Sequence, residues 1–337
     1  MINKPAPLRL LPVLLPAAFT LACLTVMLPQ LLPALDLSFL QTFRTSFLGI
    51  LLEALPFVLL GSLLSSLLHL FVTEEALDRW IPKHPVAGIL TACVLGLVFP
   101  ICECGMIPLI RRLIQKGMPV YIAIVFILSG PIINPVVYGA TYMAFRLYPE
   151  MVYARMGLAF LVSASIGFMI YATWKSSPLK VTRSTLNSES VAETKTRNRP
   201  RGSKWTAVLV HTSDEFFDMG KYLLIGCLLT AGIQSFVAKE SLTMIGNGPV
   251  SSYMFMMGFA FLLSLCSTSD AFVAQTFLTT FSSGSLLAFL VFGPMLDFKN
   301  TLMLLSVFKT KFVLYLAFLI FAVVFIGAVA VDAFYFT

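Results

Sequence analysis

The sequence predicts an all-α membrane protein, a polytopic helical bundle of about nine spans with an internal duplication. Of its 337 residues, 58% are hydrophobic and only 12% are charged, and the mean hydropathy is +0.90. Soluble domains carry roughly 25% charged residues, so the excess apolar surface is expected to face lipid. Many stretches reach the roughly 20 apolar residues that an α-helix needs to cross a bilayer. They are too long for the strands of a membrane β-barrel.

The expected spans lie near 10–35, 45–72, 86–114, 118–145, 151–174, 207–238, 250–279, 284–308 and 311–333. The first follows two basic residues but is long for a signal-peptide core, so we expect an uncleaved helix. The chain then divides into an N-terminal membrane helix at 1–40, a first repeat of four spans at 41–174, a linker at 175–204 and a second repeat of four spans at 205–337.

The linker carries nearly all of the net charge. Residues 175–204 contain eight Lys or Arg and two Glu, a balance of +6 out of the +7 of the chain. The segment is rich in Ser and Thr and poor in apolar residues, which is typical of disorder. The positive-inside rule predicts that it is cytoplasmic. Because the charge is confined to this loop, it does not indicate nucleic-acid binding.

The two halves resemble each other in sequence. Residues 60–64 (Leu-Gly-Ser-Leu-Leu) align with 225–229 (Ile-Gly-Cys-Leu-Leu) at a shift of 165, which also aligns Glu53 with Asp218. Residues 130–134 align with 293–297 at a shift of 163. The ordered matches predict a duplication. Nine single crossings would make the repeats parallel, whereas one re-entrant segment would allow an inverted arrangement.

Proline and glycine interrupt two apolar segments in each half. The interruptions are PICECGMIP at 100–108, SGPIINP at 129–135, SLCSTSDAF at 264–272 and FGPMLDF at 292–298. Backbone left unpaired at membrane depth must face protein or a watery cavity, and paired broken helices indicate a transport site. A proline kink that only shapes packing is the alternative. The expected helix-break residues are Pro100, Gly105, Pro108, Gly130, Pro131, Pro135, Gly293 and Pro294.

Ionisable and thiol side chains gather at these interruptions. A charge at the bilayer centre costs roughly 2.5–3.5 kcal/mol on insertion scales, so such residues are candidates for function. The candidate substrate-binding residues are Cys102, Glu103, Cys104, Ser129, Asn134, Cys266, Ser267, Thr268, Ser269, Asp270 and Asp297. The candidate coupling residues are Glu53, Glu103, Asp218 and Asp270, because burial favours the neutral acid and allows it to exchange a proton.

Structural roles remain open for several of these residues. Glu53 and Asp218 could form helix-packing hydrogen bonds, and a buried cysteine can be a small apolar filler. Cys102 and Cys104 are two residues apart, so they could share a ligand only if the backbone there is unwound. Asp214 and Glu215 are interpreted as helix-start residues that favour the positive end of the helix dipole.

The motifs PICECGMIPLIRRLIQKGMP, SGPIINPVV and CSTSDAF, in this order, resemble those of a family of predicted bacterial permeases that includes the ArsP-type organoarsenical efflux permeases and the YraQ-like proteins. The resemblance covers the chain from about residue 45 onward. It implies a multi-pass permease of the bacterial plasma membrane with about eight core helices. For characterised members it implies export of trivalent organoarsenicals, and on that analogy Cys102, Cys104 and Cys266 are candidate arsenic ligands.

The sequence thus favours a secondary transporter, an exporter of a small soft or thiol-reactive solute. It contains no GxxxxGK[ST] motif, so we expect an ion gradient or a partner to supply the energy. We expect no enzymatic activity, cofactor, metal or nucleic-acid partner, and we allow a homo-oligomer or an accessory protein. A membrane redox or metal-handling protein that uses the Cys-Glu-Cys segment, and a passive channel, are the alternatives.

Overall fold

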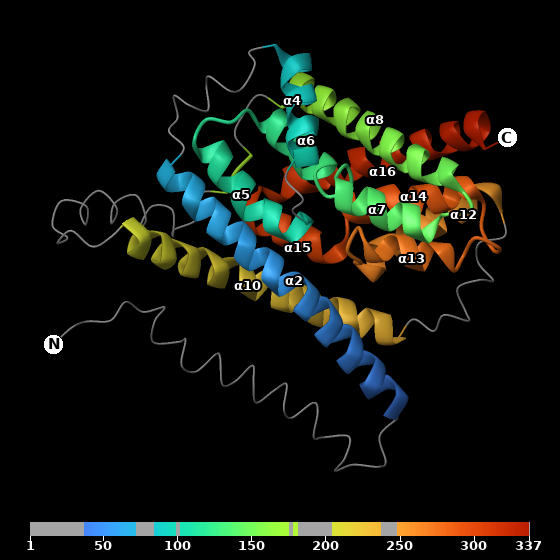
Figure 1. The fold of residues 1–337 in the computed structure, drawn as a ribbon, viewed down its shortest axis with the longest axis horizontal. Coiled ribbons are helices and arrows are strands. Elements are labelled where there is room, and N and C mark those ends of the chain that lie inside the picture. Colours follow the sequence, from blue (N-terminus) through green and yellow to red (C-terminus); the bar gives the residue numbers. More distant parts are fainter. Residues whose placement is uncertain are drawn as a thin grey trace.

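The computed structural model describes residues 37–71, 84–98, 102–174, 178–180, 204–236 and 248–336. Over these ranges the chain is helical apart from turns, caps and one isolated β-bridge between Leu179 and Phe308, so the predicted all-α fold is confirmed (Figure 1). The expected first helix at 10–35, Pro100 and most of the linker lie outside the described residues.

The helices of the N-terminal half are α2 (Leu37–Phe71), α4 (Pro85–Val98), α5 (Glu103–Gln115), α6 (Val120–Ser129), α7 (Pro135–Ala144) and α8 (Pro149–Thr173). Those of the C-terminal half are α10 (Lys204–Phe236), α12 (Pro249–Leu263), α13 (Ser269–Gln275), α14 (Ser283–Met295), α15 (Phe298–Val307) and α16 (Thr310–Tyr335). Among the described helices, each half begins with a long helix, continues with four shorter ones and ends with a second long helix.

Five segments in the described part are long and apolar enough to cross a membrane: Leu40–Leu67, Pro149–Thr173, Val208–Ser235, Ser283–Val307 and Thr310–Tyr335. The expected spans at 86–114, 118–145 and 250–279 are instead pairs of shorter helices. Helices α6 and α7 have ten residues each, or roughly 15 Å of length, about half of the hydrocarbon thickness. The protein is therefore a membrane bundle that combines long helices with interrupted ones.

Long helices surround a buried centre. Helices α2 and α10 lie against each other along one side of the bundle, and α4 and α8 lie on the other side (Figure 1). Helix α14 is apolar on all faces and almost entirely buried, and the same holds for α6 after its first turn, as is typical of central helices. Large apolar side chains such as Leu52, Leu59, Phe318 and Ile326 are exposed on the outer helices, as expected for a surface in contact with lipid.

The interruptions lie where the sequence predicts them, but fewer prolines cause them than expected. Helix α6 ends at Ser129, and the chain turns through Gly130 and Pro131 before Pro135 starts α7, a position where the missing N–H of proline removes no helical bond. Pro108 and Pro294 were expected to break helices and instead lie inside α5 and α14. Each removes one backbone hydrogen bond, which the helix tolerates because the rest of its ladder is kept.

Two of the expected glycines also lie within helices. Gly293 lies inside α14, and Gly105 lies in the first turn of α5. A Cβ atom added to Gly61 of α2 would overlap the Gly105 carbonyl group. Gly105 therefore belongs to a close contact of α2 with α5 rather than to the interruption itself.

The short helices that follow the second interruption of each half start in the same way. Asn134 is the N-cap of α7 and its side chain accepts a hydrogen bond from the Val137 N–H. Asp297 is the N-cap of α15 and its side chain accepts one from the Asn300 N–H. The two caps are 163 residues apart, the shift at which the sequence motifs align. Together with the equal order of long and short helices, these caps support the proposal that the halves are duplicates.

We predict that Gly61→Ala lowers the thermal stability of the detergent-solubilised protein. The added methyl group would overlap the backbone of Gly105, and overpacking of this kind costs about 1–3 kcal/mol. Gly49→Ala is the matched control, because Gly49 lies in the same helix and no atom lies within 4 Å of the position that its added methyl group would take. Equal melting temperatures for the two variants would show that the close contact does not contribute to stability.

Candidate functional site

A pocket lies where the interruptions of the two halves meet. Its lining is contributed by α2, by the start of α5, by the interruption between α12 and α13, and by the first turn of α15. The lining residues are Ile50, Glu53, Ala54, Phe57, Cys102, Glu103, Cys104, Cys266 and Lys299. Five of the predicted site residues are thus brought together from segments more than 200 positions apart in the sequence.

Glu103 is the buried acid of this pocket. It is the first residue of α5, where the positive end of the helix dipole stabilises a carboxylate, and it is 1% exposed. Its Oε1 atom lies 3.6 Å from the Nζ atom of Lys299. Its Oε2 atom has no hydrogen-bond partner among the described residues. One oxygen of the carboxyl group is therefore available to a proton or a ligand.

Lys299 lies between two acids. Its Nζ atom is 3.9 Å from Oδ2 of Asp297 in addition to the 3.6 Å contact with Glu103. Both distances exceed the 2.7–3.2 Å that is usual for an N–H···O hydrogen bond. The backbone N–H of Lys299 donates to Oγ of Ser264, a residue with φ of 47° at the end of α12. The lysine therefore joins α15, α5 and the interruption after α12.

Three cysteine thiols line the same pocket. Cys104 is buried, Cys102 and Cys266 are half-buried, and all three are free. Cys102 is the N-cap of α5 with an extended backbone, and Cys104 lies in the first turn of the helix. This is the unwound geometry that a shared ligand requires. The Thr268 hydroxyl lies 3.6 Å from the Cys266 sulfur.

Glu53 extends the acidic lining to α2. It is half-buried, and one of its carboxyl oxygens accepts a hydrogen bond of 3.2 Å from the Ser269 hydroxyl at the start of α13. Within the described ranges, no group of three or more His, Cys, Asp or Glu side chains is placed to hold a metal ion. The pocket is therefore a site of thiols, carboxylates and one ammonium group.

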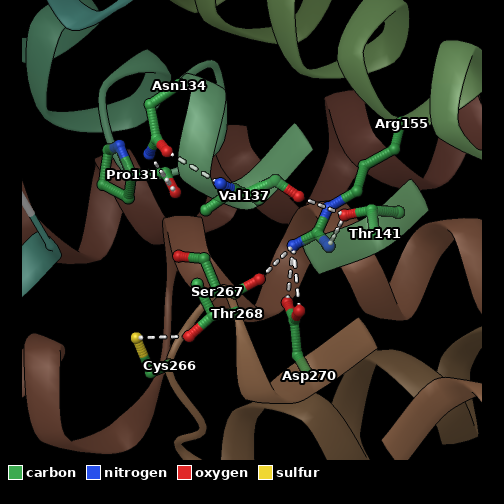
Figure 2. Close-up of polar contacts among 9 residues, drawn as sticks. All are labelled: Pro131, Asn134, Val137, Thr141, Arg155, Cys266, Ser267, Thr268 and Asp270. Atoms are coloured by element: carbon green, nitrogen blue, oxygen red, sulfur yellow. Dashed lines mark hydrogen bonds and ion pairs between the residues drawn. The ribbon is translucent and has the colours of Figure 1, made fainter. Parts of the chain in front are cut away.

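Asp270 lies outside this pocket, in an ion pair with Arg155 of α8 (Figure 2). The Nη2 atom of Arg155 lies 2.8 and 3.0 Å from the two carboxyl oxygens and 3.1 Å from the Ser267 carbonyl. Its Nη1 atom donates to the Thr141 hydroxyl at 2.8 Å. Arg155 is fully buried and Asp270 is 2% exposed. This bidentate pair fixes α13 of one half to α7 and α8 of the other.

Three other predicted site residues lie outside the pocket. The side-chain amide of Asn134 caps α7 and donates to the carbonyls of Gly130 and Pro131 (Figure 2). Ser129 is buried at the end of α6 and does not line the pocket. Asp218, which the sequence aligns with Glu53, pairs with Lys221 and its side chain is 46% exposed. The two aligned acids therefore have different surroundings, since Glu53 lines the pocket and Asp218 is exposed.

Comparison with known proteins identifies the family. A family of predicted permeases of the ArsP type matches residues 39–333. The chain belongs to this family of predicted permeases. The resemblance stated from the motifs is thereby confirmed.

Two relatives cover most of the permease. The UPF0718 protein YcgR of Bacillus subtilis is 43% identical over 294 residues, 87% of this chain and 98% of its own length. A protein of Streptococcus mutans, whose name describes it as a subunit of a two-component membrane permease complex, is 38% identical over 268 residues, 80% of this chain and 87% of its own length. No solved structure matches. The family and these relatives show that the protein is a membrane permease.

Two buried cations in the described part of the chain were not among the predicted site residues. Lys299 and Arg155 each lie inside an expected span, and an ionisable residue in a span is a functional candidate by the same rule that selected the acids. Glu215 was also misinterpreted as a helix-start residue. Helix α10 starts at Lys204, so Glu215 lies three turns inside it, where it is buried and lies 3.4 Å from Nε of Arg112.

We predict that Arg155→Met lowers stability strongly and that a second change, Asp270→Leu, recovers much of the loss. Removing one partner of a buried ion pair leaves a charge without compensation, which costs about 3–5 kcal/mol, whereas an apolar pair in its place is often tolerated. The measurement is the melting temperature of the solubilised permease. Lys221→Met is the control, because the exposed pair with Asp218 contributes about 0–1 kcal/mol. A double variant as unstable as the single one would contradict the prediction.

Proposed function

We propose that this permease is a secondary-active exporter of a small soft or thiol-reactive solute, such as a trivalent organoarsenical, in the bacterial plasma membrane. The observation that carries the proposal is the pocket at the helix interruptions, in which three free thiols lie beside two carboxyl groups and a lysine. The pocket draws on both halves of the bundle, so a movement of one half against the other would change its shape. That coupling of shape to binding is what a transporter needs.

The thiols suit a soft solute. Sulfur ligands favour soft metal and metalloid centres, whereas carboxylates favour hard cations. A trivalent arsenical with two hydroxyl groups can exchange each As–O bond for an As–S bond, and each thiol proton leaves with a hydroxyl group as water. Cys102 and Cys104 are the first pair for this exchange, because both line the pocket at the start of α5. Cys266 lines the same pocket.

The acids suit a proton as the driving ion. Asp270, which the sequence also suggested as a coupling residue, already makes two short contacts with Arg155. Glu103 has an oxygen without a partner in the described part of the chain and lines the pocket itself. A carboxyl group buried in low dielectric can exist in a neutral form, so protonation there is feasible. Glu103 is therefore the coupling acid, with Glu53 at the pocket as its nearest alternative.

Orientation and assembly complete the proposal. The linker at 175–204 is cytoplasmic by its positive charge, and the repeats at 41–174 and 205–337 derive from a duplication. Transport toward the outside agrees with the resemblance to efflux permeases. The Streptococcus relative, named as a subunit of a two-component complex, supports an accessory membrane subunit for this permease as well.

We predict that Cys102→Ser and Cys104→Ser each reduce uptake of phenylarsine oxide into everted vesicles at least about tenfold, because a hydroxyl group does not replace a soft thiol ligand. Cys93→Ser is the matched control. Cys93 is free and nearly as buried as Cys104, but it lies on α4, outside the pocket. Unchanged uptake at equal expression in the two pocket variants would refute the thiol-ligand role.

We predict that Glu103→Gln abolishes the stimulation of uptake by a pH gradient, because the amide cannot bind and release a proton. The measurement compares vesicles with and without an imposed gradient across a range of pH. Asp218→Asn is the control, since this acid is exposed and paired with Lys221. Gradient-driven uptake by Glu103→Gln with the wild-type pH profile would assign coupling to another group.

A further inference from the structure

In the described part of the permease, two buried clusters of charged side chains differ in net charge. Arg155 and Asp270 carry one charge of each sign and share two short contacts. Glu103, Asp297 and Lys299 carry two negative charges and one positive charge, all on side chains that are at most 4% exposed. The first cluster is neutral by itself, whereas the second lacks one positive charge. In a low-dielectric interior that deficit favours the binding of a proton or another cation.

The ammonium group of Lys299 lies near two acids and pairs closely with neither. Its Nζ atom is 3.6 Å from Glu103 and 3.9 Å from Asp297, so neither contact is a short hydrogen bond. One oxygen of each acid, Oε2 of Glu103 and Oδ2 of Asp297, lacks a hydrogen-bond partner among the residues described. A small displacement of the ammonium group would give it a close contact with one acid and remove it from the other.

The two acids belong to different halves. Asp297 and Lys299 lie at the start of α15, two residues apart, whereas Glu103 lies on α5 of the N-terminal half. The contact of Lys299 with Asp297 is therefore local, and its contact with Glu103 joins the halves. The stem of Lys299 runs past Gly226 of α10, where a Cβ atom would lie 3.4 Å from the lysine Cα and Cγ atoms. Glycine at this position leaves room for the stem to move.

We propose that Glu103, Asp297 and Lys299 form a single-proton site. Glu103 binds the proton, and Lys299 links the charge of Glu103 to the contact between the halves. A proton on Glu103 supplies the missing charge and removes the attraction that holds Lys299 to α5, so the ammonium group pairs with Asp297. Loss of the proton restores the attraction between the halves. The proton is bound at Oε2 of Glu103, the oxygen without a partner, and it is released from the same atom. This inference rests on the proposed proton-coupled transport and assigns its coupling to named groups.

Other titratable groups surround this site. They are Glu53 of α2, Cys102 and Cys104 at the start of α5, Cys227 of α10, Cys266 between α12 and α13, and the pair of Asp270 with Arg155. The tests below therefore change Glu103 and Lys299 separately and together, with the neighbouring groups intact.

The first test reads the proton directly and needs no transported solute. Infrared difference spectroscopy of the purified full-length permease, recorded between acidic and alkaline pH, should show the C=O band of one protonated carboxyl group that is lost in Glu103→Gln. Lys299→Met should change the midpoint of that band by at least about one pH unit, since the nearest charge is removed. Lys221→Met, which removes a lysine from an exposed pair, should leave it unchanged. A band that is absent, or that Lys299→Met does not move, overturns the proposal.

The second test reads transport in proteoliposomes with phenylarsine oxide as the solute. The double variant Glu103→Gln with Lys299→Met keeps the wild-type net charge of the cluster. A transport defect in this variant is therefore not explained by the change in buried net charge that could unfold either single variant. Relative to its own exchange without a gradient, the double variant should lose at least about tenfold of gradient-driven transport and show a flat pH profile. Gradient-driven transport with the wild-type profile overturns the proposal. If the infrared result holds and the wild-type protein exchanges no arsenical, the proton site stands and the proposed solute is wrong.

Discussion

The contact between the halves depends on charge: two buried acids at helix interruptions each meet a cation on the other half of the bundle. Glu103 of the N-terminal half faces Lys299, and Asp270 of the C-terminal half faces Arg155. An uncompensated charge in the bilayer is costly, and that cost disappears only when the halves are docked. Docking of the halves and burial of the acids are therefore one event, and what changes the charge of an acid also changes the contact between the halves.

The two ion pairs differ in the length of their contacts. We assign a structural role to the pair with short contacts and a functional role to the pair with long ones. Arg155 is enclosed by the Asp270 carboxyl group, the Ser267 carbonyl and the Thr141 hydroxyl, and it does not line the pocket (Figure 2). Such a network fixes the interruption after α12 in one arrangement. Lys299 has long contacts and lies in the pocket beside the thiols. A transporter needs both kinds, a rigid joint around which the halves move and a loose contact that senses what is bound.

Much of the bundle and part of the site could be predicted from the sequence. The length of the apolar stretches predicted the helices, and the prolines and glycines predicted the positions of the interruptions within a few residues. Charge in an apolar run selected Glu103 and Asp270, both of which are buried. Sequence patterns report on neighbours along a helix, so they did not identify Lys299 and Arg155 as the partners, nor did they separate Glu53 in the pocket from the aligned Asp218 on an exposed face. Those distinctions depend on which helices pack together.

The proposed duplication repeats the backbone of the site but not its lysine, which only the C-terminal half contributes to the pocket. Both halves keep the cap that starts the short helix after the second interruption, with Asn134 in one half and Asp297 in the other. The side chains next to the caps have diverged. At the same shift of 163 residues, the counterpart of Lys299 is Val136, an exposed apolar residue on α7. The backbone geometry is thus repeated while the ammonium group is not. In the described part of the chain, this repeated scaffold with one lysine in the pocket gives one charge-deficient cluster, which our proposal assigns to one proton for each cycle of movement.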